Sequence, residues 1–74
     1  MPAFEIVHNI STDEIEFLTP KLQAFLDDFK ASIPRAHRRW EKKRWVVSAA
    51  YRQELEAVLV RHFPSARFIW KEIQ

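Results

Sequence analysis

The 74-residue chain contains no glycine, and this absence limits the turns by which it can fold. Glycine adopts positive φ angles at no steric cost, and two-residue β-hairpin turns depend on such angles. Every turn of this chain must therefore avoid positive φ, or place asparagine, aspartate or a charged residue there. The same absence excludes all phosphate-binding loops that require glycine.

A basic β-hairpin is predicted over Arg35–Val47 (RAHRRWEKKRWVV), between two helix-like segments. If Lys42 and Lys43 form its turn, Trp40 lies opposite Trp45 on the paired strand. Side chains alternate along a strand, so each face of the hairpin receives every second residue. One face would carry Arg38, Trp40, Trp45 and Val47. The other face would carry His37, Arg39, Glu41, Arg44 and Val46.

Two segments have the apolar spacing of amphipathic helices, and a proline follows each of them. The first helix is expected over Pro20–Ile33, because the Thr19 hydroxyl can cap a helix whose first residue is proline. The second is expected over Ala49–His62, with Ser48 as its cap. The expected core combines the apolar faces of both helices with neighbouring strand residues: Phe25, Leu26, Phe29, Trp45, Leu55, Val58, Leu59 and Phe68.

Alternating apolar and polar residues predict three further strands, at Ala3–His8, Glu14–Leu18 and Ser65–Ile73. For the second of these, the alternative is a helix that begins at Thr12, but Pro20 would break it within two turns. The element order is then ββαββαβ, in which two ββα units precede a closing strand. Consecutive hairpins favour a single α+β domain (residues 1–74), an antiparallel sheet with both helices on one face.

Catalysis and metal binding have little support in the sequence. There is no cysteine, and His8, His37 and His62 are too far apart to form a local metal site. No hydrolase, metalloprotease or nucleotide-binding motif occurs. We therefore expect a non-enzymatic protein without metal or cofactor. No apolar run approaches the roughly 20 residues of a membrane span, and no targeting signal is evident, so we expect a cytoplasmic (intracellular) protein.

The charge is unevenly distributed, although the net charge is only +2. Residues 1–33 carry two basic and six acidic side chains, whereas residues 34–74 carry ten basic and four acidic ones. Basic side chains bind nucleic-acid phosphates, and tryptophan can stack on an unpaired base. The leading hypothesis is therefore binding of DNA or RNA by Arg35, Arg38, Arg39, Trp40, Lys42, Lys43 and Arg44. The alternative interpretation of this hairpin is a charged, exposed turn that protects a sheet edge.

A lysine, a proline, an arginine and two tryptophans follow one another along the run Phe29-Lys30-x-x-Ile33-Pro34-x-x-x-Arg38-x-Trp40, then Trp45-x-Val47, Tyr51 and Leu55. This run resembles the HARP-type module, which occurs beside the motors of annealing-helicase DNA translocases and in small bacterial and phage proteins. The similarity covers about residues 22–59. Arg35 replaces the family's glycine, and the loop between the tryptophans is two residues shorter. The resemblance implies a ββα element that helps to bind or position on DNA, without catalysis by this chain.

A second hypothesis places the function in the acidic half of the chain. A protein-interaction module, or a phage-type inhibitor or adaptor, could occupy the surface of a larger protein by mimicking phosphates with carboxylates. The candidate residues for this interface are Asp13, Glu14, Glu16, Asp27 and Asp28. The protein is expected to be a monomer or an edge-strand dimer, since an open sheet of five strands leaves two edges unpaired.

Overall fold

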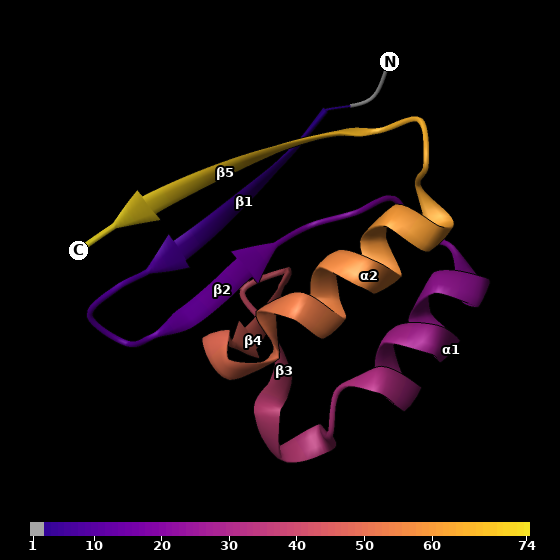
Figure 1. Cartoon of the computed structure of the whole chain (residues 1–74). Helices are drawn as coiled ribbons and strands as arrows, with labels where there is room; N and C mark the ends of the chain where they lie inside the picture. The colour runs from indigo at the N-terminus through magenta and orange to yellow at the C-terminus, as the bar shows by residue number, and fades with distance from the viewer. Residues whose placement is uncertain (1–2) are drawn as a thin grey trace.

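The computed structural model describes residues 3–74, which form a five-stranded sheet with two helices packed on one face (Figure 1). The elements occur in the predicted ββαββαβ order, so the α+β class is confirmed. They are β1 (Ala3–Asn9), β2 (Glu14–Phe17), α1 (Gln23–Ser32), β3 (Arg38–Glu41), β4 (Arg44–Ser48), α2 (Arg52–His62) and β5 (Arg67–Ile73). Short 3-10 turns, η1 (Arg35–His37) and η2 (Ala49–Tyr51), precede β3 and α2.

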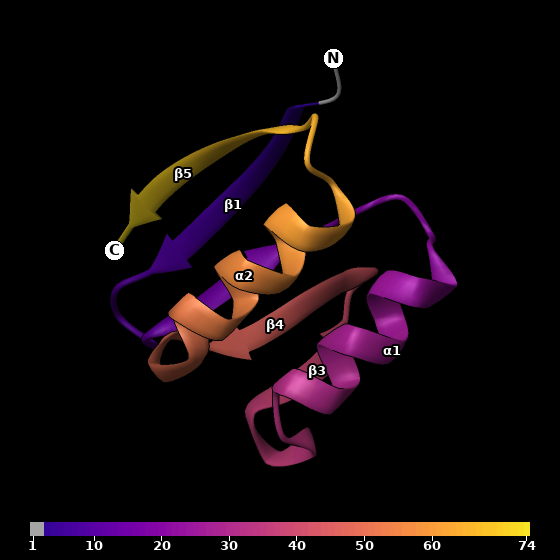
Figure 2. The same cartoon turned by 45° about the vertical axis from the view of Figure 1, so that its right-hand side comes forward.

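The strands lie in the order β3-β4-β2-β1-β5, and one of the four pairings differs from expectation. Three neighbouring pairs are antiparallel, but β5 runs parallel to β1, with Ala3 opposite Arg67. The sheet is therefore mixed and not wholly antiparallel. The reason is that α2 carries the chain back across the sheet after β4, so that β5 repeats the direction of β4. Since β4 is two antiparallel steps from β1, β5 is parallel to β1 as well (Figure 2).

The core lies between the helices and the sheet face that they cover. Phe25 and Phe29 of α1 are fully buried and stacked, with ring centroids 5.5 Å apart. Phe17 of β2 meets both rings edge-on. The predicted core residues of α2 are buried too: Leu55, Val58 and Leu59. The other three expected core residues are only partly buried against this cluster: Leu26, Trp45 and Phe68.

Both helices start differently from the prediction. The first begins at Gln23, and residues 18–22 stay non-helical, with Leu22 in an extended conformation. Thr19 is therefore not its cap, because this segment has to cross from the end of β2 to the start of α1. In the second case, the Ser48 hydroxyl makes no cap hydrogen bond and lies 3.1 Å from Nδ1 of His37 instead. The 3-10 turn η2 leads into α2 without a side-chain cap.

The turns without glycine follow the predicted rule. Positive φ angles occur at Asp13 (54°), Lys42 (51°) and Lys43 (62°), which are an aspartate and two lysines. Two consecutive residues of positive φ make the tight hairpin turn that matches the twist of paired strands, a turn usually built from Asn-Gly or Asp-Gly. Residues with a Cβ atom are strained there by about 1–2 kcal/mol each.

Candidate nucleic-acid interface

The β3–β4 hairpin forms one edge of the sheet and has the predicted register. Trp40 lies opposite Trp45 and Glu41 opposite Arg44, so that the turn falls at Lys42-Lys43. Trp45 packs edge-on against Phe29 at 4.8 Å, which places its face of the hairpin toward the helices. Trp40 projects from that same face, and the two indole rings are 5.4 Å apart at an angle of 69°.

An apolar groove opens beside Trp40, between the hairpin, α1 and the connection from β2 to α1. Its volume is about 270 Å³, and its walls are Leu18, Thr19, Pro20, Lys21, Leu26, Trp40 and Trp45. Trp40 leaves 54% of its surface in solvent, and Leu18 leaves 53%. This volume lies just below the range of pockets for drug-sized ligands, so the groove has room for one planar ring such as a nucleobase.

Two of the six basic hairpin residues are engaged by the protein itself. The Nε of Arg38 donates a 2.9 Å hydrogen bond to the carbonyl of Ile33 and so holds β3 to the end of α1. The guanidinium of Arg39 donates hydrogen bonds to the carboxylates of Glu14 and Glu41. These bonds raise the pKa of Arg39, and the same pairing lowers the pKa of Glu14. Neither arginine is therefore a strong candidate for phosphate contact.

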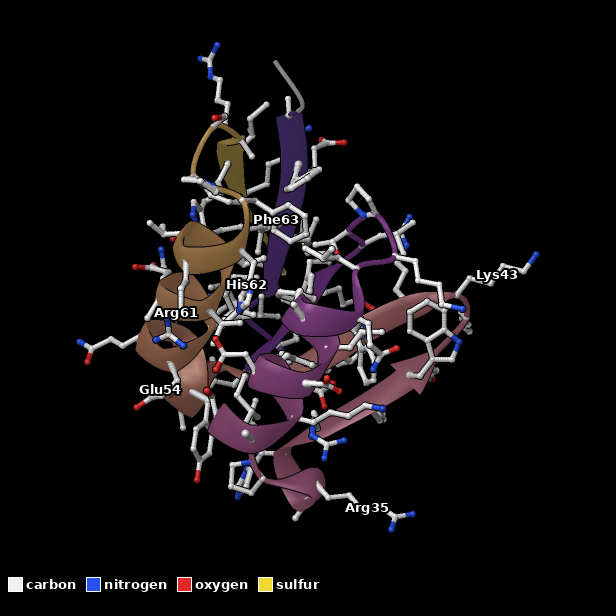
Figure 3. The ribbon with its side chains drawn as sticks, turned by 90° about the vertical axis from the view of Figure 1, so that its right-hand side faces the viewer. Arg35, Lys43, Glu54, Arg61, His62 and Phe63 are labelled. Atoms are coloured by element: carbon white, nitrogen blue, oxygen red, sulfur yellow. The ribbon has the colours of Figure 1, made fainter. Side chains whose placement is uncertain are left out.

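The other four basic residues are exposed, and within residues 3–74 they form no ion pair: Arg35, Lys42, Lys43 and Arg44. Lys43 projects into solvent from the hairpin tip, and Arg35 lies at the opposite end of the hairpin (Figure 3). Arg44 is on the face of the hairpin that points away from the helices, because it neighbours the inward Trp45. Lys42 lines a hollow together with Glu16, Arg39 and Arg44, whereas Lys43 follows it at the hairpin tip. The two tip lysines come two and three residues after Trp40, so they are the unpaired basic hairpin residues that follow it most closely in the chain.

Lys21 completes the groove, and the sequence did not reveal it. It lines the groove together with Leu18 and Pro20, across from Trp40. The sequence pattern placed Lys21 in the first turn of a helix, where a lysine has no special meaning. Only the non-helical path of residues 18–22 brings it toward the hairpin, and no local signal predicts that path.

The structure does not bring the five acidic candidates together. Asp13 lies in the β1–β2 turn, 3.1 Å from Nε2 of His8. Glu14 and Glu16 are on the sheet face away from the helices, since they alternate with the buried Ile15. The remaining two, Asp27 and Asp28, are on α1, in the other layer of the molecule.

Asp28 is engaged in a cluster between the two helices. Its carboxylate lies 2.8 Å from Nε2 of His62 and accepts hydrogen bonds from Arg61 and from the Ser32 hydroxyl. Figure 3 shows Arg61 and His62 on α2, on the side that faces α1. The hydrogen bond with His62, followed by the contacts from Arg61 and Ser32, lowers the pKa of Asp28. This carboxylate therefore joins the helices and is poorly placed for a partner.

Across residues 3–74 there is no group of three or more His, Cys, Asp or Glu side chains that could hold a metal ion. No helix in this range is long and apolar enough to cross a membrane. No model of a known protein family, no curated protein and no solved structure matches this chain. The groove and the hairpin tip are therefore the features of residues 3–74 that bear most directly on function.

Proposed function

We propose that this protein binds single-stranded nucleic acid at the hairpin edge of its sheet. One unpaired base stacks on Trp40 over the apolar groove, and Lys42, Lys43 and Lys21 contact the phosphates on either side of it. The observation that carries this proposal is a tryptophan with more than half of its surface exposed, beside an apolar groove and a lysine pair at positive φ. Stacking of a base on an aromatic side chain contributes about 1–3 kcal/mol.

Single strands fit this groove better than duplexes do. The surface that the groove exposes is mainly apolar, so it favours the flat face of a base and not its hydrogen-bonding edge. In a duplex those faces are stacked on neighbouring base pairs and are closed to Trp40. The resemblance to the HARP-type module also supports binding to DNA, and β3, β4 and α2 have the ββα order that it implies. A nucleic-acid ligand fits the intracellular location that we expect for this protein.

The direct test is fluorescence anisotropy with short labelled oligonucleotides of DNA and RNA, single- and double-stranded, over a range of salt. If three lysines each neutralise one phosphate, log Kd should change with log salt with a slope of about 2 on single strands. Trp40→Ala should weaken single-strand binding by about 5- to 160-fold, which corresponds to the stacking energy of one base. Its effect on duplex binding should be small.

Charge reversal separates a local contact from a general effect of net charge. Lys43→Glu should weaken binding by at least about tenfold, or 1.4 kcal/mol. Arg67→Glu changes the net charge equally but lies on β5, at the opposite edge of the sheet, and should have little effect. Equal losses from the two variants, or no binding of any oligonucleotide at low salt, would show that the hairpin is not a nucleic-acid site.

A protein partner is the second candidate, and the groove is the observation that favours it. An interaction module or a phage-type inhibitor or adaptor could accept an aromatic or leucine anchor between Leu18, Trp40 and Trp45. The dispersed acidic residues offer no comparable surface. Such binding would depend on Trp40 but only weakly on salt, because the groove walls are mainly apolar.

A further inference from the structure

The two edges of the sheet are protected very differently. At one edge, β3 is four residues long, and three of these are charged. At the other, β5 is seven residues long and carries Ile69 and Ile73 on its exposed outer face, with 36% and 45% of their surfaces in solvent. Short length and charge are devices that keep an edge strand from pairing with another chain. The β5 edge is not short, and charged residues occupy only part of it.

The backbone shows which groups of β5 are open to a new strand. The N–H of Ile10 donates a 2.7 Å hydrogen bond to the carbonyl of Ile73, so the backbone groups of Ile73 point toward β1. In a strand these groups alternate in direction from residue to residue. Those of Phe68, Trp70 and Glu72 therefore point away from the sheet, where no other strand of residues 3–74 lies.

We propose that β5 pairs antiparallel with β5 of a second copy of this chain, about a two-fold axis that passes beside Trp70. In this register, Trp70 lies opposite the partner's Trp70, and Phe68 lies opposite the partner's Glu72. All these positions carry outward backbone groups, so each pair exchanges both of its N–H···O=C bonds. The result is a closed dimer with one continuous ten-stranded sheet, and it uses a surface separate from the nucleic-acid groove.

Side-chain charges select this register over its neighbours. Moving the pairing so that Trp70 faces the partner's Phe68 places Arg67 opposite the partner's Lys71. Moving it the other way places Lys71 opposite the partner's Lys71. Like charges directly opposite each other destabilise a strand pair.

The Trp70-centred register has no such conflict. It sets Lys71 opposite the partner's Ile69, and Arg67 opposite the partner's Ile73. The aliphatic stems of lysine and arginine can cover the two exposed isoleucines while their charged ends stay in water.

A second copy of the chain would also cover a groove on the helix side of the β5 edge. A groove of about 220 Å³ runs between α2 and β5, lined by Arg52, Glu56, Leu59, Val60, Phe68 and Trp70. The guanidinium of Arg52 lies over the indole of Trp70, 4.3 Å from the ring centroid. A two-fold axis beside Trp70 brings this groove against its copy, so the two indoles cover each other. Aromatic pairs across neighbouring strands stabilise a sheet.

The test is sedimentation equilibrium of the full chain, without nucleic acid, at concentrations up to about 0.5 mM, near the weakest association that it resolves. The wild-type protein should form a dimer and no larger species. Glu72→Pro removes an outward N–H while it leaves the bonds to β1 intact, and proline is tolerated on edge strands. It should weaken the dimer at least tenfold, or about 1.4 kcal/mol. The matched control, Glu72→Ala, keeps the N–H and should leave the dimer unchanged.

A charge swap tests the register itself. Ile69→Lys places a lysine opposite the partner's Lys71 and should also weaken the dimer. Adding Lys71→Glu to that variant places opposite charges across the axis and should restore it, while the new lysine stays beside Glu5 of β1. Circular dichroism of each variant shows whether the monomer remains folded. A wild-type monomer, larger assemblies, equal effects of the two Glu72 variants, or a failed rescue would each overturn this proposal.

Discussion

Trp40 and Trp45 face each other across the same two strands, yet they have different roles. Trp45 packs against Phe29 and the core, whereas Trp40 lies over the groove with more than half of its surface exposed. Trp45→Ala should therefore lower the free energy of unfolding by about 3 kcal/mol, near the lower end for aromatic residues because Trp45 is only partly buried. Trp40→Ala should lower it by less than about 1 kcal/mol. Urea unfolding followed by circular dichroism measures both, and equal losses would contradict these separate roles.

The carboxylate of Asp28 should make stability depend on pH in acid. Its pKa is lowered by the hydrogen bond with His62 first, and then by Arg61 and Ser32. A group whose pKa is lower in the folded state stabilises the fold fully above its unfolded pKa of about 3.9, and that contribution is lost as the pH falls through the folded pKa. The neutral variant Asp28→Asn should therefore lose less stability than the wild type below about pH 4.

Urea unfolding at a series of pH values measures this effect. Glu5 and Glu14 also have lowered pKa values, through hydrogen bonds from Lys71 and Arg39, and both remain in the variant. Some acid sensitivity should therefore persist in Asp28→Asn. An acid dependence as steep as that of the wild type would show that Asp28 does not contribute.

At the scale of elements, the two lysines of the β3–β4 turn have a strained backbone conformation. Lys42 and Lys43 have φ angles of 51° and 62°, which favour asparagine and glycine. Lys42→Asn with Lys43→Gly should raise the free energy of unfolding by about 1–2 kcal/mol, because glycine has no Cβ atom and asparagine tolerates positive φ better than lysine does. If our proposed function is correct, the same variant should bind single strands more weakly.

The matched control is Lys42→Ala with Lys43→Ala, which removes both charges but keeps both Cβ atoms. It should bind as weakly as the Asn-Gly variant without becoming more stable. Thermal unfolding and anisotropy on the three proteins separate strain from charge. An Asn-Gly variant that is no more stable than the wild type would show that the lysines are not strained.

The sequence predicted those elements whose geometry is local. The register of the β3–β4 hairpin follows from a two-residue turn at Lys42-Lys43, which places Trp40 opposite Trp45. The direction of β5 did not follow, since it depends on how α2 crosses the sheet. The start of α1 was also missed, because Thr19-Pro20 has a strong local preference that the path from β2 overrides. The groove could not be predicted for the same reason, because four of its seven lining residues lie on that path.

At the scale of the whole molecule, the proposed dimer would place one groove at each end of a ten-stranded sheet. The two β3 strands would be nine strand spacings apart, roughly 43 Å along the sheet. An oligonucleotide long enough to reach both grooves should then bind at least about tenfold more tightly than one of half its length. Ile69→Lys should abolish this gain while leaving the affinity for the short oligonucleotide unchanged. If Ile69→Lys still binds the longer oligonucleotide more tightly than the shorter one, this difference in affinity does not come from the dimer.

The parallel pairing of β1 with β5 also determines how the chain reaches its final form. Both hairpins join neighbouring segments, but this pair joins Ala3 to Arg67, across almost the whole described chain. Closing a long loop costs entropy before its contacts form, so such pairs form late in folding. While the chain is being synthesised, β1 has an unpaired edge until β5 has left the ribosome. The nascent protein is thus most prone to aggregation just before its last strand emerges.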